Sequence, residues 1–386
     1  MNKISVLKRI GIFLRRILLC AFTVLLSAVI TLMLIMNVIC NGGSEAAKEM
    51  FVTTILETGA LKFLASVYLS DEEITEIVNN NKMEELDTEV NTELITFKAR
   101  DTETRETVTS RTSEKKETLV YEVKEAEDVN YAEEEIDEDN DGIIVYDVAG
   151  RTFSGKMMVV LDPARVTLES YYETYKTGAP LDKIVGMVNG VAGINGGLYA
   201  QSEAGGRPYG VTVSHGVIET NKPTEKAGLV FVGLTEENIL IVENLSDMTE
   251  DDVEKLVAEK KIRDGCSFQE EAKDKNNHFV SLVINGVGRE LGEGAGSGLN
   301  PRTAIGQRAD GALLLLVTDG RGKSGHLGAS AQDLIEIMLE YGAVNAANLD
   351  GGSSSSMVFN GEYLMESVTF RKANTSWNLP IAFVVQ

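Results

Sequence analysis

Hydrophobic and polar positions divide the chain into segments of different character. The first is a run of 24 residues without a charge, from Ile17 to Cys40. A helix rises about 1.5 Å per residue, so this run is long enough to cross the roughly 30 Å of a bilayer's hydrocarbon core. Lys and Arg residues precede the run and acidic residues dominate after it. This asymmetry predicts a cytoplasmic tail over residues 1–16 and a single-pass anchor over residues 17–40, with everything after it outside the cytoplasm.

Two other interpretations fit the apolar run less well. A cleaved signal peptide has an apolar core of about 7–15 residues and a small-residue cleavage site. This run is longer, and no clean A-x-A site follows it. Cys40 would suit a lipoprotein, but Ile39 fits poorly just before a lipidated cysteine. The pattern favours an uncleaved anchor, and each interpretation leaves the rest of the chain extracytoplasmic.

A stalk and a linker are expected after the anchor. Phe51 to Leu69 and Asp71 to Val78 carry apolar residues at helical spacing, so residues 41–78 are predicted to form a helical stalk. Residues 79–141 are rich in Glu, Asp, Thr and Lys and hold few large apolar residues. Such a segment buries too little apolar surface to offset the entropy of ordering, which predicts an acidic flexible linker, with one short strand conceivable at Leu119 to Val123.

An acidic motif closes the linker. Asp137, Asp139, Asp141 and Gly142 match the first half of an EF-hand calcium loop. The bidentate Glu that completes such a loop is replaced by Val148. An acidic turn before a strand is therefore favoured over a calcium site.

From residue 142 onward the pattern is that of a globular domain. Short apolar runs predict strands, namely Ile143–Asp147, Lys156–Leu161, Val166–Glu169, Ala192–Asn195, Leu229–Val232, Ile239–Val242, Val280–Ile284 and Leu313–Val317. Helical spacing predicts helices at Leu181–Val188, Thr249–Ala258 and from the N-cap Ser330 to the C′ residue Gly342. Asn285-Gly286 and Asn360-Gly361 predict hairpins, because both central residues of a type I′ turn need positive φ. Many strands with few helices leave a mixed α/β and an α+β domain open for residues 142–386.

Composition removes several function classes. The formal net charge of -23 and the pI near 4.6 exclude the basic face that a nucleic-acid partner requires. Three cysteines, of which only Cys266 lies beyond the anchor, rule out a disulfide scaffold, and no Cys/His cluster indicates zinc. With only three histidines, a multi-histidine metal site is not expected, and no metal or cofactor is predicted.

Four segments place glycines and polar residues at the end of an apolar run, where ligand-binding groups commonly lie. They are Gly193–Gly197, Asn300–Gly306, Thr318–Gly322 and Asn348–Ser356. Together they supply two carboxylates, two guanidiniums, an asparagine and a Gly/Ser turn whose backbone N–H groups can bind an anion. No G-x-S-x-G elbow is present, which argues against a serine nucleophile.

These groups suit a sugar phosphodiester. Carboxylates serve an oxocarbenium-like transition state as nucleophile or base, and guanidiniums with backbone donors bind phosphate. Cleaving the sugar C1–O bond expels a phosphomonoester, which needs less acid assistance than an ordinary leaving group. The same groups would also bind a phosphorylated sugar without cleaving it.

The blocks GINGGLY, NPRTAIGQRADG, LLLLVTDGRG and GAVNAANLDGGSSSSMVFNG resemble the signature segments of the phosphodiester glycosidase family. The resemblance covers roughly Gly142 to Gln386 and is densest from Asn300 to Met357. The anchor and the segments FVTTILETGALKFLAS and KMMVVLDPARV are similar to those of bacterial members linked to exopolysaccharide biosynthesis.

The resemblance implies an α+β domain that hydrolyses a glycosyl-1-phosphodiester. By motif position, it implies catalytic roles for Asp350, Asp319 and Asn195. It implies substrate or phosphate binding by Arg302, Thr303, Arg321, Gly196, Gly197, Gly351, Gly352 and Ser353. Asp350 is expected as the central carboxylate and Asp319 as its partner, with the nucleophile and acid/base roles left open between them.

The expected function is hydrolysis of this bond on cell-surface or exopolysaccharide glycans, releasing a sugar and a phosphomonoester. The alternative is a non-catalytic module that binds phosphorylated glycans during exopolysaccharide assembly. Expected partners are the phosphorylated glycan and, through the anchor, the cell membrane. The sequence departs from the family where Leu198, Tyr199 and Ala200 follow INGG without a nearby Asp, and in an acid-free block from Lys323 to Leu327; both departures bear on which substrate is used.

Overall fold

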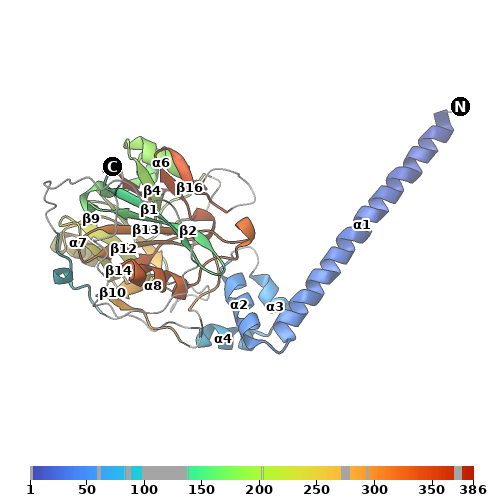
Figure 1. Cartoon of the computed structure of the whole chain (residues 1–386), viewed down its shortest axis with the longest axis horizontal. Helices are drawn as coiled ribbons and strands as arrows, with labels where there is room; N and C mark the ends of the chain where they lie inside the picture. Colours follow the sequence, from blue (N-terminus) through green and yellow to red (C-terminus); the bar gives the residue numbers. More distant parts are fainter. Residues whose placement is uncertain are drawn as a thin grey trace, which may run out of the picture. The chain divides into compact units, whose positions relative to one another are not determined.

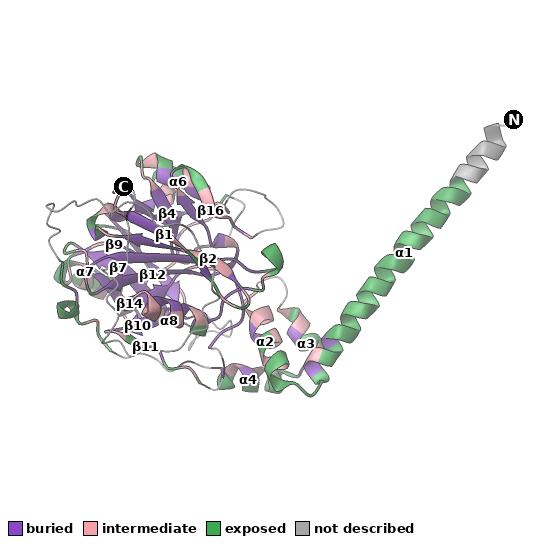
Figure 2. Cartoon of the chain, viewed as in Figure 1, coloured by how far each residue is buried: buried purple, intermediate pink, exposed green. Residues whose placement is uncertain are grey.

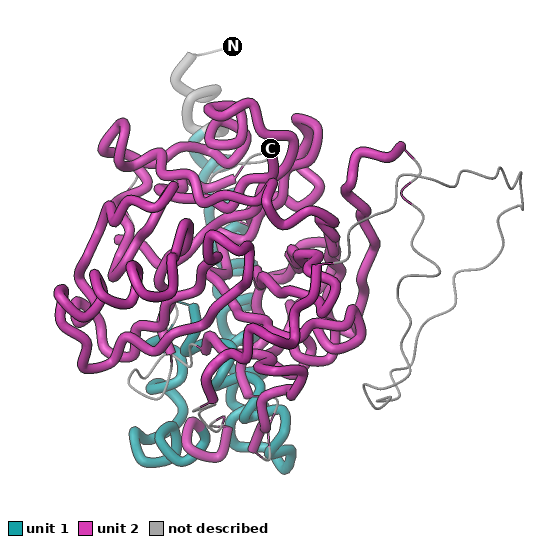
Figure 3. The backbone as a smooth tube through the Cα atoms, turned by 90° about the vertical axis from the view of Figure 1, so that its left-hand side faces the viewer, with its two compact units in different colours: residues 1–77 teal, residues 78–386 magenta. Residues whose placement is uncertain are grey.

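The computed structural model describes residues 3–58, 62–81, 83, 88–97, 137, 139–200, 202, 204–270, 279–292, 294, 296–368 and 376–386. Contacts divide the chain into two units, residues 1–77 and residues 78–386 (Figure 3). Most of the expected linker over residues 79–141, including the conceivable strand at Leu119–Val123, lies outside the described residues.

The first unit is helical. Its elements are α1 (Lys3–Asn41), α2 (Glu45–Leu56), α3 (Phe63–Tyr68) and the start of α4 (Asp71–Asn80). One helix in the described part of the chain is long and apolar enough to cross a membrane, over Gly11–Asn41, with a mean hydropathy of 2.7. The apolar segment from Phe51 to Leu69 forms two helices, because α2 ends at Leu56 and α3 begins at Phe63.

The second unit contains three sheets (Figure 1). The seven-stranded sheet has the order β1-β2-β13-β12-β14-β10-β11, formed by Ile143–Ala149, Ser154–Val160, Leu313–Thr318, Thr303–Arg308, Ala343–Asn348, Ser281–Ile284 and Val287–Gly288. One five-stranded sheet has the order β16-β15-β4-β17-β3, formed by Glu362–Met365, Met357–Phe359, Ala192–Asn195, Ile381–Val385 and Val166–Ser170. The other has the order β6-β5-β9-β7-β8, formed by Val217–Asn221, Val211–Ser214, Ile262–Gln269, Leu229–Thr235 and Leu240–Asn244.

The three sheets share one apolar core. Side chains from every sheet meet in it, among them Val317, Phe383 and Phe268, and Figure 2 shows the strands as the most buried elements of the unit. The α-helices of this unit are α5 (Tyr171–Tyr175), α6 (Leu181–Met187), α7 (Glu250–Glu259) and α8 (Ala331–Glu340). α8 packs on β10 and β14, α6 on β4 and β17, and α7 on β9. Every strand pair among the described residues is antiparallel, so the expected α+β class is confirmed.

Local chemistry fixes the element ends as the sequence predicts. Ser330 caps α8 in a reciprocal capping box with Asp333. Gly342 follows that helix with φ of 75°, the left-handed conformation that a C′ glycine adopts at low cost. Asn285-Gly286 turns β10 into β11 with both residues at positive φ, as a type I′ hairpin requires.

Part of the expected linker is hydrogen-bonded to other parts of the second unit. The backbone N–H of Asn91 donates to Asn285 Oδ1 (2.7 Å), and Asn285 Nδ2 donates to Glu89 O (2.9 Å). The N–H of Thr96 donates to Ala309 O (2.7 Å). The described residues 88–97 are therefore held along this unit by hydrogen bonds.

Candidate functional site

The predicted site residues gather where strands of two sheets end. β12 pairs with both β13 and β14, so these three strands are neighbours in the seven-stranded sheet. Thr303 begins β12, Asp319 follows β13, and Asp350 lies two residues beyond β14. Asn195, the last residue of β4, joins them from the adjoining five-stranded sheet. The topology thus brings together residues that are up to 155 positions apart in the chain.

Asn195 connects these strand ends. Its side chain is 1% exposed, and Nδ2 donates to the backbone oxygen of Asp350 (2.5 Å). Its Oδ1 accepts from Thr303 Oγ1 (2.7 Å) and from the backbone N–H of Ser356 (3.2 Å). A buried amide with its donor and acceptor both used fixes the geometry around it. Asn195 therefore holds both ends of the Asp350–Ser356 turn against β12, a supporting position rather than an exposed one.

Gly196 and Gly197 allow a close approach of β4 to its neighbours. A Cβ on Gly197 would lie 2.3 Å from Ser267 O on β9, so no side chain fits at this position. The carbonyl of Gly196 accepts from the N–H of Asp350 (3.3 Å). The INGG motif thus brings the Asp350 backbone and β9 together, which explains its glycines by packing.

The charge of Asp350 contributes to the raised pKa values of two buried residues, Tyr199 and Cys266. Neither residue was predicted from the sequence to belong to the site. Burial and the nearby Asp350 charge raise the pKa of Tyr199 above its usual value, and its hydroxyl lies 3.2 Å from Ser354 Oγ. Burial, with a smaller contribution from Asp350, raises the pKa of Cys266 to about 12. Asp350 itself is half-buried. Asp350 therefore lies near buried side chains that are neutral at physiological pH, and it is itself only partly covered.

Arg321 lies over the turn that follows Asp350. Its Nη1 donates to Ser353 Oγ (3.0 Å) and its Nε to Asn300 Oδ1 (3.2 Å), while the residue as a whole is exposed. Gly352 has φ of 62°, and a Cβ there would lie 2.6 Å from Arg321 Nη2. Gly352 also donates its N–H to Pro301 O (2.7 Å). The turn thus holds an exposed guanidinium directly above its backbone.

The same turn uses much of its own hydrogen-bonding capacity internally. Ser354 N–H donates to Gly351 O (3.1 Å), and Ser356 N–H is taken by Asn195. Ser353 Oγ donates to Val368 O (3.3 Å) while it accepts from Arg321. The predicted anion-binding role of Gly351, Gly352 and Ser353 therefore depends on the remaining donors and on the guanidinium above them, and it stays a prediction.

Arg302 is buried and engaged by the protein. It is 5% exposed, and its Nε donates to Ala329 O (3.2 Å). Its Nη2 donates to Ser297 Oγ (3.0 Å) and Gly298 O (2.6 Å). The guanidinium also lies 5.0 Å from the Phe279 ring centroid, a cation–π distance. These contacts tie the glycine-rich segment around Ser297 and Gly298 to Ala329, just before α8. The phosphate role expected for Arg302 stays a prediction.

Asp319 is paired with a histidine that the sequence did not reveal. The carboxylate is 7% exposed, with Oδ1 accepting from the Ser154 N–H (2.8 Å) and Oδ2 lying 2.7 Å from His326 Nδ1. The loop that carries His326 closes through Gly322 N–H to His326 O (2.7 Å). The signal was a histidine seven residues after the aspartate, within one short turn. Asp319 thus orients an imidazole whose side chain is 27% exposed.

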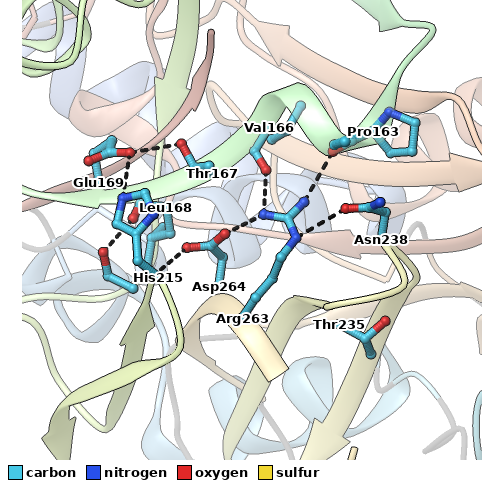
Figure 4. Close-up of polar contacts among 12 residues, drawn as sticks. Pro163, Val166, Thr167, Leu168, Glu169, His215, Thr235, Asn238, Arg263 and Asp264 are labelled. Carbon is cyan, nitrogen blue, oxygen red and sulfur yellow. Dashed lines mark hydrogen bonds and ion pairs between the residues drawn. The ribbon is translucent and has the colours of Figure 1, made fainter. Parts of the chain in front are cut away.

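A second polar cluster joins the two five-stranded sheets (Figure 4). His215 Nε2 lies 3.0 Å from Glu169 Oε1 on β3, and the His215 N–H donates to Asp264 Oδ1 (3.0 Å) on β9. Arg263 contacts Asp264 and donates to Val166 O (2.8 Å). Burial raises the pKa of Asp264. Because its charges pair with each other and with backbone across the sheet boundary, we interpret this cluster as structural.

One group in the described residues has carboxylates close enough to share a metal ion. Asp137, Asp139 and Asp141 place one oxygen each within 4.8 Å of one another. Val148, which replaces the completing glutamate of an EF-hand, is buried in β1. The turn therefore has the first half of a calcium loop, while β1 occupies the position of the second half.

Comparison with known proteins fits this arrangement. Residues 189–386 match the model of the phosphodiester glycosidase family. The chain is 43% identical over 65 residues to the uncharacterized SPbeta prophage protein YomE of Bacillus subtilis, covering 17% of this chain and 10% of that protein. It is 40% identical over 63 residues to the Bos taurus N-acetylglucosamine-1-phosphodiester alpha-N-acetylglucosaminidase, covering 16% and 12%. The match therefore spans only about a tenth of the length of these curated relatives.

A solved structure is also similar, the zebrafish N-acetylglucosamine-1-phosphodiester alpha-N-acetylglucosaminidase catalytic domain auto-inhibited by its pro-peptide. The TM-score is 0.48 at 18% identity, over 63% of this chain and 82% of that one. The family model, in contrast, covers just over half of the present chain and includes Asn195, Arg302, Asp319 and Asp350. The chain therefore belongs to the phosphodiester glycosidase family.

Proposed function

We propose that this protein hydrolyses a glycosyl-1-phosphodiester on cell-surface or exopolysaccharide glycans, releasing a sugar and a phosphomonoester. The observation that carries the proposal is the turn after β14, where the half-buried Asp350 is followed by Gly352 and Ser353 beneath the Arg321 guanidinium. A carboxylate on this turn and an exposed guanidinium over it match the two halves of a glycosyl phosphodiester, the sugar carbon and the phosphate.

Asp350 is assigned to the sugar side of the reaction. A carboxylate there stabilises the oxocarbenium-like transition state, as nucleophile or as the base that activates water. Arg321 is assigned to the phosphate, whose charge grows as the C1–O bond breaks. A guanidinium is suited to this because it presents a planar fork of donors to phosphate oxygens. Asn195 and Thr303 hold the turn in place. Asp319 holds the His326 imidazole in position through its contact with Nδ1.

The test measures release of free sugar from a series of sugar-1-phosphodiesters by the full-length protein in detergent. Asp350→Asn is expected to abolish release while circular dichroism stays unchanged. Asp147→Asn is the matched control, because that carboxylate is 85% exposed on β1 and pairs only at the surface with Lys156. An unchanged rate in Asp350→Asn would refute the assignment. Saturable binding of these compounds without turnover by the wild-type protein would favour the alternative, a phosphoglycan-binding module.

We also propose that α1 anchors the protein in the cell membrane with its N terminus in the cytoplasm. Support comes from the apolar helix over Gly11–Asn41 and from the positively charged residues before its uncharged run. The full chain is expected to resist alkaline extraction from membranes and to be digested by protease added from outside. Release of a shorter, soluble form would instead indicate a cleaved signal sequence.

A further inference from the structure

The helices after the apolar span fold back onto it. Within the first unit, Tyr68 Oη on α3 donates to the backbone oxygen of Met33 on α1 (3.4 Å). Met36 and Cys40 are buried, while most described side chains of α1 are exposed (Figure 2). Cys40 shares an apolar cluster with Val52 on α2 and with Leu69 after α3. The last turns of α1 are therefore covered on one face by α2 and α3.

The position of Met33 along α1 sets the depth of this contact, on the proposal that α1 is a membrane anchor. The uncharged run begins at Ile17, directly after Arg15 and Arg16. At about 1.5 Å per residue, Met33 lies roughly 24 Å along the run, short of the roughly 30 Å needed to cross the hydrocarbon. The Tyr68 hydroxyl thus reaches an atom about 6 Å inside the outer boundary. α3 must then lie in the outer interface, not above it in water.

The free face of α3 has the chemistry for that position. Phe63 is 61% exposed and Val67 is 57% exposed. They are four residues apart on the helix and so share one face. Charged residues flank this pair in the sequence: Lys62 precedes it, and the acidic first turn of α4 follows it from Asp71. Interfacial helices combine such an apolar face with flanking polar groups, and tyrosine is enriched at the same level.

We propose that α3 is a membrane-interface helix whose Phe63 and Val67 insert among the lipid acyl chains of the outer leaflet. Lipid is favoured as the occupant because this face is exposed while α3 itself packs on α1. It does so at a depth where the apolar span is still in hydrocarbon. α1 and α3 then contact the bilayer together, and the chain leaves the membrane at the acidic start of α4. This inference rests on the anchoring proposal and is independent of the enzymatic one.

The experiment places a single tryptophan in the full-length protein reconstituted in lipid vesicles. Trp377, the only native tryptophan, is changed to Phe, and Phe63→Trp is introduced. The expected result is blue-shifted emission with strong loss of fluorescence when the lipids carry bromine near the headgroup end of the acyl chain, and a smaller loss with bromine near the methyl end. Val24→Trp, about 10 Å along the uncharged run and so closer to the bilayer midplane, is expected to show the opposite depth preference. Glu72→Trp, on α4, is expected to show no quenching.

The outcomes separate the two proposals. Quenching of Val24→Trp without quenching or blue shift of Phe63→Trp would leave the anchor intact and overturn the interface helix. Blue-shifted but unquenched emission from Phe63→Trp would mean that a second copy of the chain covers α3, which also overturns the inference. Absence of quenching in Val24→Trp would overturn the anchor, and the inference with it.

Discussion

Asn195 offers the sharpest test of how the site is held together. Replacing it with Ala removes a donor to Asp350 O and an acceptor shared by Thr303 Oγ1 and the Ser356 N–H. Losing a buried hydrogen-bond partner costs about 1–3 kcal/mol per group. Three such groups predict a loss of about 3–9 kcal/mol, a large part of the roughly 5–15 kcal/mol that stabilises a typical domain. Thr303→Val removes one of the three bonds and is expected to cost about 1–2 kcal/mol.

Asn195→Asp adds a dependence on pH with a defined sign. The new carboxyl keeps the acceptor but, when ionised, faces the Asp350 carbonyl oxygen with no donor. Its site is 1% exposed and close to the Asp350 charge, so its folded pKa is expected to lie above the unfolded value of about 3.9. A raised folded pKa gives stability that is fully present below the unfolded pKa and is lost as pH rises through the folded pKa. The variant should therefore approach the wild type in acid and fall behind it at neutral pH.

Urea unfolding of the three variants and the wild type, at pH 5 and pH 8, measures these differences. Circular dichroism reports the fold, and the midpoint with the slope gives the free energy of unfolding. The reasoning is refuted if Asn195→Ala costs less than about 1 kcal/mol. It is also refuted if the deficit of Asn195→Asp is the same at both pH values, because the carboxyl would then not be exchanging its proton in a buried site.

Three further predictions follow from single positions. Gly352→Ala places a Cβ 2.6 Å from Arg321 Nη2 at φ of 62°, so it should displace the guanidinium and lower sugar-phosphodiester affinity or turnover at least tenfold, about 1.4 kcal/mol; unchanged kinetics would contradict the phosphate role of Arg321. Cys266 is fully buried with a pKa raised to about 12, so peptide mapping should find it unmodified by a thiol alkylating reagent in the native protein and modified in urea; labelling at the native rate of a free thiol would contradict that burial. The pKa of Glu219 is raised by burial and by the neighbouring Glu173, so its ionised form destabilises the fold. Glu219→Gln should therefore raise the urea midpoint at neutral pH, and this gain should vanish below the unfolded pKa of about 4.3. A gain of equal size at low pH would point to another cause.

Sequence periodicity predicted much of the domain's framework, because its signals are local. β4 has the predicted bounds Ala192–Asn195, and α8 begins after Ser330 as its capping box requires. Both Asn-Gly turns form hairpins because their φ requirement is met by the residues themselves. The division into three sheets was not predictable in this way. It depends on pairings between strands that are distant in the chain, such as β4 with β17. The apolar pattern of a strand shows that it is buried but does not show which strand it pairs with.

For the site, too, residues could be predicted from the local sequence, whereas contacts between distant segments could not. The motifs brought Asn195, Asp319 and Asp350 into view because polar residues at strand ends are conspicuous in the sequence. The direction of each side chain was not visible, since it depends on the neighbouring strand. His326 was missed because its partner Asp319 is recognised only once the loop closes, and Tyr199 because its partner Ser354 lies 155 residues away.

The two arginines show why this matters for mechanism. By motif position, Arg302 was expected as the phosphate-binding arginine, and Arg321 was expected among the substrate- or phosphate-binding residues. In the fold, Arg302 is 5% exposed and donates to carbonyls around the glycine-rich segment, whereas Arg321 is exposed above Gly352 and Ser353. A guanidinium that already satisfies buried carbonyls can reach a ligand only by leaving those carbonyls unpaired, at about 1–3 kcal/mol each. The exposed Arg321 guanidinium would exchange water and side-chain partners such as Ser353 Oγ and Asn300 Oδ1 for phosphate oxygens, without leaving buried carbonyls unpaired. On the proposed function, we therefore expect Arg321 to supply most of the binding energy for the phosphate, and Arg302 to stabilise the loop beside it.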